Sequence, residues 1–242
     1  MGLKLLILGA TGATGKLTVE QALAKGHKVT VYVRESQKLP SDVENKHNLT
    51  VIEGDLASGP EKLRPLLPKV DAIISILGPT GGATYVGTAI TEFYEGLLEE
   101  LRQVPAGKRP YLLAMGTQSI IDPDDGFSLF TRVHILTIKN LYRRVRAEII
   151  GIGRVFKEEL KRAQSQEDDE KLDWTVYRLN LLKDYGLPLE GSRAGYVGKD
   201  GWIATMDRAQ LATWLLEEAE SKRWNRKLPA LWGIDSHNPQ YS

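Results

Sequence analysis

Three glycines near the N-terminus have the spacing of a phosphate-binding loop. Residues 9–15 read Gly-Ala-Thr-Gly-Ala-Thr-Gly, between an apolar run and a segment with helical periodicity. In such a loop the first glycine turns the chain out of a strand, the second lets backbone N–H groups approach a pyrophosphate, and the third lets the helix pack on the sheet. The alternative is a glycine-rich turn that binds nothing. The residues predicted to hold a dinucleotide at the helix N-terminus are Gly9, Thr11, Gly12, Ala13, Thr14 and Gly15.

The residue that follows the second predicted strand bears on which dinucleotide is bound. NAD usually meets an acidic side chain about 20 residues after the glycines, at the ribose 2′-hydroxyl. Here Val29–Val33 is followed by Arg34 and then Glu35. A guanidinium is a planar, permanently charged fork that suits a phosphate, so we predict NADP in preference to NAD. The alternative is a surface pair between Arg34 and Glu35.

Other candidates follow the later strands, where ligands bind in open α/β sheets. Asp55 and Leu56 follow the third strand, Gly78 the fourth and Gly116 the fifth, and all four are predicted cofactor contacts. Asp55 has two interpretations, because its carboxylate could accept from the adenine amino group or cap a helix.

Three side chains are candidates for the chemistry itself. Thr117 and Ser119 carry hydroxyls just after the fifth strand, and either could hold a substrate carbonyl by a hydrogen bond. The alternative for both is a turn residue whose hydroxyl forms a hydrogen bond with the backbone of its own turn. His134 could act as a general acid near neutral pH, although a single His is more often structural.

Two loops are predicted to select the substrate, since loops at the carboxyl edge normally do so. They are Ile121–Arg132 and Asp184–Trp202. An apolar, aromatic-lined pocket would favour a small hydrophobic or planar molecule. Its expected lining is Phe127, Phe130, Tyr185, Tyr196 and Trp202.

The composition excludes several classes of function. The chain has 242 residues, 32 Lys and Arg against 31 Asp and Glu, four His and no Cys. The absence of Cys excludes disulfides, thiol nucleophiles and Cys-type metal sites, and the scattered His residues predict no metal. Balanced charge argues against a nucleic-acid partner. No apolar run is long enough for a membrane span or resembles a signal peptide, so we expect a cytoplasmic protein with no membrane partner. We expect it to be a monomer or a homodimer.

Alternating strands and helices must position these residues. Strands are expected at Leu3–Leu8, Val29–Val33, Leu49–Glu53, Asp71–Leu77, Tyr111–Met115 and Trp174–Leu179. Helices are expected at Thr14–Lys25, Glu61–Leu67, Thr84–Gln103, Leu136–Gln164 (broken or kinked at Gly151 and Gly153) and Asp207–Ser221, the last capped by Asp207. The pattern predicts an α/β fold, a doubly wound parallel sheet with helices on both faces. We expect one domain over 1–242, with a small substrate lobe from 117–134 and 184–206.

Taken together, these motifs resemble the atypical short-chain dehydrogenase/reductases, especially the NmrA-like and flavin/biliverdin-IXβ-reductase-like proteins. The resemblance covers roughly residues 1–220 and rests on the glycine motif, Arg34, Gly-Asp-Leu at 54–56, Asp-Ala-Ile-Ile at 71–74, Leu-Asp-Trp-Thr-Val-Tyr-Arg at 172–178 and Met-Asp-Arg at 206–208. It implies a Rossmann domain that binds NADP, with a substrate cleft over the nicotinamide. Thr117 matches best the Ser found after strand five in the flavin-reductase-like members.

One departure from the broader superfamily concerns the proton donor. That superfamily uses Tyr-x-x-x-Lys on the helix after strand five, whereas the similar string here is Tyr142-Arg143-Arg144-Val145-Arg146. An Arg does not replace the Lys, so no Tyr general acid is assigned. The leading hypothesis is an NADP(H)-dependent oxidoreductase acting on a small hydrophobic or planar molecule. The alternatives are a non-catalytic NADP sensor that binds a protein partner, and a non-redox isomerase or cyclase.

Overall fold

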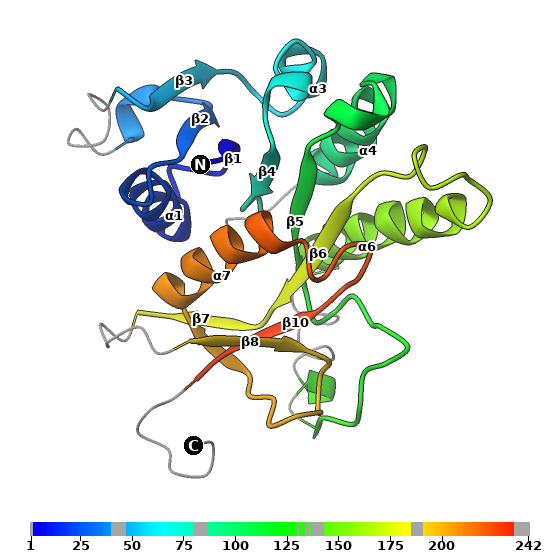
Figure 1. Cartoon of the computed structure of the whole chain (residues 1–242). Helices are drawn as coiled ribbons and strands as arrows, with labels where there is room; N and C mark the ends of the chain where they lie inside the picture. Colours follow the sequence, from blue (N-terminus) through cyan, green and yellow to red (C-terminus); the bar gives the residue numbers. More distant parts are fainter. Residues whose placement is uncertain are drawn as a thin grey trace.

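The computed structural model describes residues 2–39, 47–79, 87–129, 131–133, 136, 143–184 and 191–234, and Figure 1 labels most of its strands and helices. The strands are β1 Lys4–Leu8, β2 Lys28–Val33, β3 Leu49–Glu53, β4 Ala72–Ser75, β5 Tyr111–Thr117, β6 Trp174–Leu179, β7 Leu181–Lys183, β8 Ser192–Gly195, β9 Thr205–Asp207 and β10 Ala230–Gly233. The helices are α1 Ala13–Ala24, α3 Gly59–Leu63, α4 Ala89–Gln103, α6 Arg143–Ala163 and α7 Arg208–Ser221, with short 3₁₀ turns η1 Ser36–Lys38, η2 Leu67–Lys69 and η4 Ala106–Lys108.

A central sheet of eight strands organises the molecule, in the order β3-β2-β1-β4-β5-β6-β10-β8. The strands are parallel except β8, which runs antiparallel to β10. The first six follow the doubly wound order, in which the chain reverses its direction of travel between β1 and β4. This confirms the predicted α/β, Rossmann-like fold class. A separate two-stranded ribbon is formed by β7 and β9.

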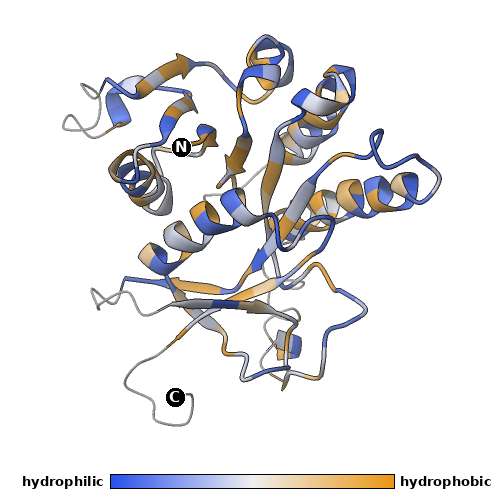
Figure 2. Ribbon diagram, viewed as in Figure 1, coloured by the Kyte–Doolittle hydropathy of each residue, from blue (hydrophilic) through white to orange (hydrophobic). Residues whose placement is uncertain are grey.

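Both faces of the sheet are covered by helices, because successive strand residues point to opposite sides. On β1, Leu6 and Leu8 belong to one apolar cluster, together with side chains of α4 and α6. Leu5 and Ile7 belong to the other, together with side chains of α1 and α7. Figure 2 shows the apolar strands lying between helices whose outer residues are hydrophilic. The continuous apolar runs are therefore explained by burial on two faces.

Four strands near the C-terminal end were not predicted. The loop predicted at Asp184–Trp202 contains a strand, because Ser192–Gly195 forms β8, paired residue by residue with β10. The sequence Ser-Arg-Ala-Gly has little intrinsic β-propensity, so pairing with a distant segment decides its conformation. The short strands β7 and β9 arise in the same way, by pairing residues 181–183 with 205–207.

The two glycines expected to break the long helix do not break it. Helix α6 is continuous through Gly151 and Gly153. A Cβ at Gly151 would lie 2.5 Å from Thr91 Oγ1, and one at Gly153 would lie 2.8 Å from Ile120 Cγ2. Both glycines therefore allow close packing of α6 on α4 and on the segment after β5. The low helix propensity of glycine is outweighed by this tertiary contact.

The ends of three other helices follow local rules. Asp207 caps α7 as predicted: its Oδ1 accepts from Ala209 N (2.7 Å), and Gln210 Oε1 accepts from Asp207 N (3.2 Å). The helix expected at Glu61–Leu67 lies at Gly59–Leu63, because Pro65 has no backbone N–H with which to continue the helical hydrogen bonds. Helix α4 begins at Ala89, after Gly87 with φ +121°.

No helix in the described part of the chain has the length and apolarity needed to cross a membrane.

Candidate functional site

The loop between β1 and α1 is built by two glycines that the fold itself requires. Gly9 has φ +82°, a conformation that L side chains rarely adopt. A Cβ at Gly15 would lie 2.1 Å from the carbonyl oxygen of Gly9, so α1 can begin here only without a side chain at this position. The first and third glycines of the motif therefore hold the turn and the close approach of helix to strand.

Gly12 differs from the other two, because the fold leaves space beside it. It is the N-cap of α1 with φ −75°, and a Cβ there would meet only the Gly9 carbonyl oxygen, at 3.5 Å. No side chain caps α1, and its first turn holds no acidic residue. The N-terminus of α1 thus presents backbone N–H donors beside a position that glycine keeps open. This cradle fits a pyrophosphate.

The cradle lies at the point where the sheet reverses direction. Strand β1 is hydrogen bonded to β2 on one side and to β4 on the other, so the loops after β1 and β4 leave toward opposite faces. Ligands bind at this crevice in doubly wound folds. Gly78 follows β4 there, and a Cβ on it would lie 2.1 Å from Met115 Cε. Gly78 therefore makes room for Met115, a packing role that is compatible with a nearby ligand.

Arg34 follows β2 and points to solvent without an ion pair to any described residue. Its sequence neighbour Glu35 pairs instead with Lys38, at 2.6 Å. The backbone N–H of Ser36 donates to Glu53 Oε1 (2.7 Å), which ties this turn to the end of β3. The hydrogen bonds from Ser36 lower the pKa of Glu53. The structure therefore contains no ion pair between Arg34 and Glu35, which was the alternative interpretation.

Asp55 supports the turn that leads into α3. Its Oδ1 accepts from Ser58 N (2.8 Å) and from Ser58 Oγ (2.9 Å), which lowers the pKa of Asp55. Its carbonyl oxygen accepts from Tyr32 Oη, at 2.7 Å. Asp55 therefore supports the turn before α3 and does not cap the helix, whose N-cap is Ser58, and the adenine contact stays a prediction. Leu56 is half-buried against the core on the α4 side of the sheet.

The carboxyl end of β5 brings two of the three catalytic candidates together. Thr117 Oγ1 accepts from Ser119 N at 3.2 Å, so this hydroxyl closes its own turn. Ser119 is buried, and its Oγ has no hydrogen-bond partner among the described residues. Gly116 is enclosed by Val176 and Ile120, which would lie under 3 Å from an added Cβ. The third candidate, His134, lies outside the described residues.

An ion pair that the sequence did not predict fastens the following loop. Arg178, at the end of β6, donates to Asp125 twice: Nη1 to Oδ2 at 2.6 Å and Nη2 to Oδ1 at 2.7 Å. Its Nε also donates to Leu228 O, at 2.6 Å. Burial alone raises the pKa of Asp125, but the hydrogen bonds and charge of Arg178 outweigh it and lower that pKa. An Arg inside an otherwise apolar strand was the available signal, because such a side chain requires a partner.

The two segments predicted to form a substrate lobe touch one another. Gly126 N donates to Val197 O (2.7 Å), and Val197 N donates to Asp125 Oδ1 (3.1 Å). Of the expected aromatic lining, Phe130 and Tyr185 lie outside the described residues. Tyr196 packs edge-on against Trp224, with ring centroids 6.0 Å apart. The aromatic pocket therefore stays a prediction.

Two tyrosines near the end of β4 are too deeply buried to donate protons to a substrate. Tyr94 Oη lies 2.7 Å from Ser75 Oγ, and Tyr177 Oη donates to Ser75 O at 2.8 Å. Burial raises the pKa of both phenols well above the usual value. Tyr142, the superfamily-like tyrosine, lies outside the described residues. Neither Tyr94 nor Tyr177 therefore takes the place of a general acid on this geometry.

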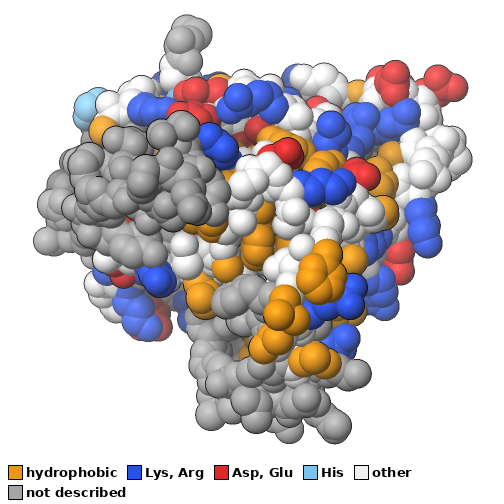
Figure 3. All heavy atoms as spheres, turned by 90° about the horizontal axis from the view of Figure 1, so that it is seen from below, with side chains coloured by type: hydrophobic (Ala, Val, Ile, Leu, Met, Phe, Trp, Pro, Cys, Tyr) orange, Lys and Arg blue, Asp and Glu red, His pale blue; other side chains and the backbone are white. Residues whose placement is uncertain are grey.

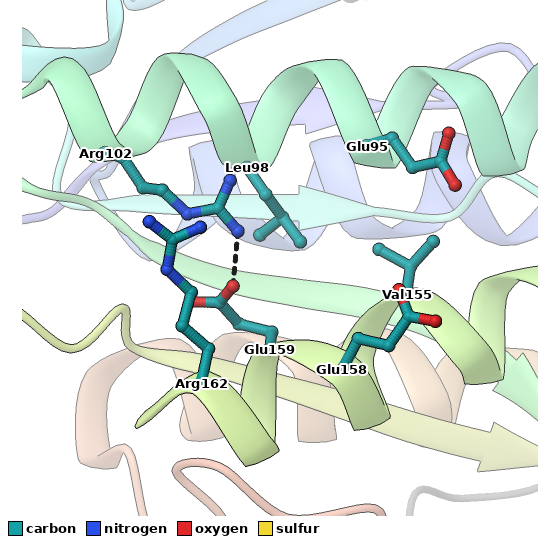
Figure 4. A pocket seen from close by; sticks show the side chains of 7 residues that line it. All are labelled: Glu95, Leu98, Arg102, Val155, Glu158, Glu159 and Arg162. Atoms are coloured by element: carbon teal, nitrogen blue, oxygen red, sulfur yellow. Dashed lines mark hydrogen bonds and ion pairs between the residues drawn. The ribbon is translucent and has the colours of Figure 1, made fainter. Parts of the chain in front are cut away.

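A hollow of about 220 Å³ lies between α4 and α6, apart from the carboxyl edge of the sheet (Figure 4). Arg102 of α4 and Glu159 of α6 form an ion pair across it. Its lining mixes both charges with two apolar side chains: Glu95, Leu98, Arg102, Val155, Glu158, Glu159 and Arg162. The paired charges join the two helices, so we assign this hollow no part in the site.

Residues 9–122 match the family described as NAD(P)H-binding. The photosystem II assembly factor Ycf39 of Synechocystis is 25% identical over 93% of this chain and 61% of its own length. The matched regions span 23–61% of the first curated relatives.

Solved structures share the fold. A short-chain dehydrogenase/reductase from Veillonella parvula in complex with NADP has a TM-score of 0.72 at 15% identity, covering 98% of both chains. A candidate NADH-flavin reductase from Streptococcus pneumoniae has a TM-score of 0.66 at 19% identity, covering 96% of this chain and 100% of that one.

Proposed function

From the match of residues 9–122 to the NAD(P)H-binding family, we propose that the protein is an NADP(H)-dependent oxidoreductase. Its substrate is a small hydrophobic or planar molecule. The nicotinamide supplies the hydride, and the protein orients the two reactants. We also propose a single domain, with the segments 117–134 and 184–206 as its substrate lobe.

The observation that carries the proposal is the open cradle at Gly12. Gly9 and Gly15 are required by the fold, whereas Gly12 is not, and its missing Cβ leaves space in front of uncapped N–H groups. A pyrophosphate would accept from these donors, and the positive end of α1 would stabilise its charge. The ribose 2′-phosphate of NADP would meet Arg34. Thr117 and Ser119 would lie on the substrate side, at the end of β5.

A second candidate function is a non-catalytic NADP sensor that binds a partner. It is favoured by the exposed apolar side chains just after β5, among them Phe127 and Leu129. Large apolar patches of this kind often mark interaction sites. Hydride transfer separates the two candidates, since a sensor binds the cofactor without turning it over.

The test is a binding titration with NADPH, NADH, NADP and NAD, followed by NADPH oxidation against flavins, quinones and enones. We expect the NADP forms to bind most tightly and at least one acceptor to be reduced. If no dinucleotide binds below the millimolar range, the central proposal is wrong. Tight binding without turnover of any acceptor would favour the sensor.

Replacing Arg34 by Ala tests the cofactor preference. Because the Arg34 side chain has no ion pair to a described residue, the substitution leaves no described carboxylate without its partner. We expect NADP binding to weaken by roughly 1.5–3 kcal/mol, the worth of a charged hydrogen bond, with little change for NAD. Isothermal titration of both cofactors measures this difference. An equal loss for NADP and NAD would refute the 2′-phosphate role.

A further inference from the structure

Most of the exposed, large apolar side chains of the described chain come from one stretch. Seven such residues are more than a third exposed, and six of them lie between residues 121 and 150. Phe127 and Leu129 are the most exposed, at 68% and 66%. The six are Ile121, Phe127, Leu129, Val133, Leu136 and Ile150. Apolar side chains that gather in this way on a surface usually mark a binding site.

The loop after β5 lies against one side of α6. Lys157 Nζ donates to Ile121 O at 2.6 Å, and the side chain of Ile120 packs against Gly153, where a Cβ would leave it no room. Ile150 precedes Gly153 by three residues, so it lies on the same side of the helix. Figure 3 shows apolar side chains gathered on this face of the molecule, with Lys and Arg side chains next to them. We call this surface, comprising Ile121, Phe127, Leu129, Arg132, Ile150 and Lys157, the basic apolar face.

The charge of this region differs from that of the rest of the chain. Residues 121–157, which span this face, contain seven Lys and Arg and four acidic residues, Asp122, Asp124, Asp125 and Glu148. From the totals of 32 and 31, the remaining chain therefore has 25 basic and 27 acidic residues. Glu148 is buried and accepts from Thr91 N at 2.5 Å, so it contributes little negative charge to the surface.

The cations of the face stand directly beside its apolar side chains. The guanidinium of Arg132 lies 4.8 Å from the centre of the Phe127 ring. Acidic residues lie on both sides of these cations in the sequence: the loop contains Asp122, Asp124 and Asp125, of which Asp125 is held by Arg178, and Glu158 follows Lys157. Arg154 is the described cation of α6 that is paired, with Glu95 at 2.9 Å. Arg132 and Lys157 have no described carboxylate within ion-pair distance.

We propose that the basic apolar face binds the surface of an anionic phospholipid membrane. Phe127 and Leu129 enter the boundary between headgroups and acyl chains, and Arg132 and Lys157 contact lipid phosphates. Protruding apolar side chains with cations beside them suffice for such binding and need no partner surface of matching shape. The expectation of no membrane partner was based on the lack of an apolar run long enough to span a membrane. Binding at the membrane surface needs no such run. It holds whether the protein turns over NADPH or only binds it.

The test is co-sedimentation of the full chain with vesicles, of phosphatidylcholine alone or with phosphatidylglycerol added. We expect binding at least about tenfold tighter to the anionic vesicles, weakening as salt is added. Phe127→Ser combined with Leu129→Ser, and separately Arg132→Glu, should each weaken binding about tenfold or more. The matched control is Lys108→Glu, the same charge reversal at the amino end of β5, which should leave binding unchanged.

Other results would overturn the proposal. Equal binding to neutral and anionic vesicles, or binding that neither variant weakens, would exclude this face. If wild-type chain ignores vesicles and light scattering shows a dimer that the Phe127/Leu129 variant converts to monomer, the occupant is a second copy. If vesicles are ignored and the variant instead raises the KM for an apolar acceptor, these side chains line the substrate site. Circular dichroism checks folding, and Arg132→Gln replaces Arg132→Glu if the latter unfolds.

Discussion

Replacing Gly12 by Val should abolish dinucleotide binding while the protein stays folded. The new side chain would occupy the space in front of the N–H groups of α1, where its Cβ meets protein only at 3.5 Å. Its φ of −75° suits any residue. We expect affinity for NADPH to fall at least about 100-fold, roughly 2.7 kcal/mol. The loss of a favourable N-cap should cost only about 1 kcal/mol of stability.

Substitutions at two further glycines distinguish a loss of cofactor binding from a loss of folding. Gly107→Val is the matched control, because a Cβ at Gly107 meets nothing within 4 Å and the residue lies at the amino end of β5. It should bind NADPH as the wild type does. Gly15→Val should fail to fold, since its Cβ would collide with the Gly9 carbonyl oxygen. Retained NADPH affinity in a folded Gly12→Val protein would remove the pyrophosphate assignment.

Replacing Arg178 by Leu should produce a large loss of stability. Arg178 is fully buried, and its removal leaves Asp125 without a charged partner. Breaking a buried pair in this way costs about 3–5 kcal/mol. For a chain of this size that lowers Tm by roughly 6–20 °C. Thermal and urea unfolding measure the change, and the loop 121–126 should become accessible to proteases first.

The exposed pair Arg154–Glu95 provides the comparison. Its side chains are 60% and 48% exposed, so Arg154→Leu should cost at most about 1 kcal/mol. The double variant Arg178→Leu, Asp125→Leu should recover part of the loss, because it leaves no unpaired buried charge. Similar effects for Arg178→Leu and Arg154→Leu would show that the buried pair does not anchor the loop.

Acid should reduce the difference between wild type and Arg178→Leu. The pKa of Asp125 is lowered in the folded protein, so its stabilising effect is complete above the unfolded pKa of about 4. That effect is lost as the pH falls through the folded value. The stability gap between the two proteins should therefore be largest at neutral pH and shrink below about pH 4. A gap that is constant down to pH 3 would contradict the role of the charged pair.

The sequence predicted the first six strands because they are buried on two faces. Runs such as Leu-Leu-Ile-Leu at 5–8 need no distant partner to be recognised, and their spacing with helices implies a parallel sheet. Helix ends governed by local chemistry, such as the Asp207 cap, could be predicted as well. The strand β8 could not, because its conformation depends on β10, about 40 residues further along the chain.

By itself, the sequence determined the fold class, the glycine loop and the absence of thiol chemistry, since each depends on residue type and local spacing. The tertiary structure decided which glycine is open to a ligand: Gly9 and Gly15 are closed by neighbouring backbone, and Gly12 is not. It also decided that Gly151 and Gly153 serve packing, and that Arg178 holds Asp125. These outcomes depend on distances between segments far apart in the chain, which no local pattern encodes.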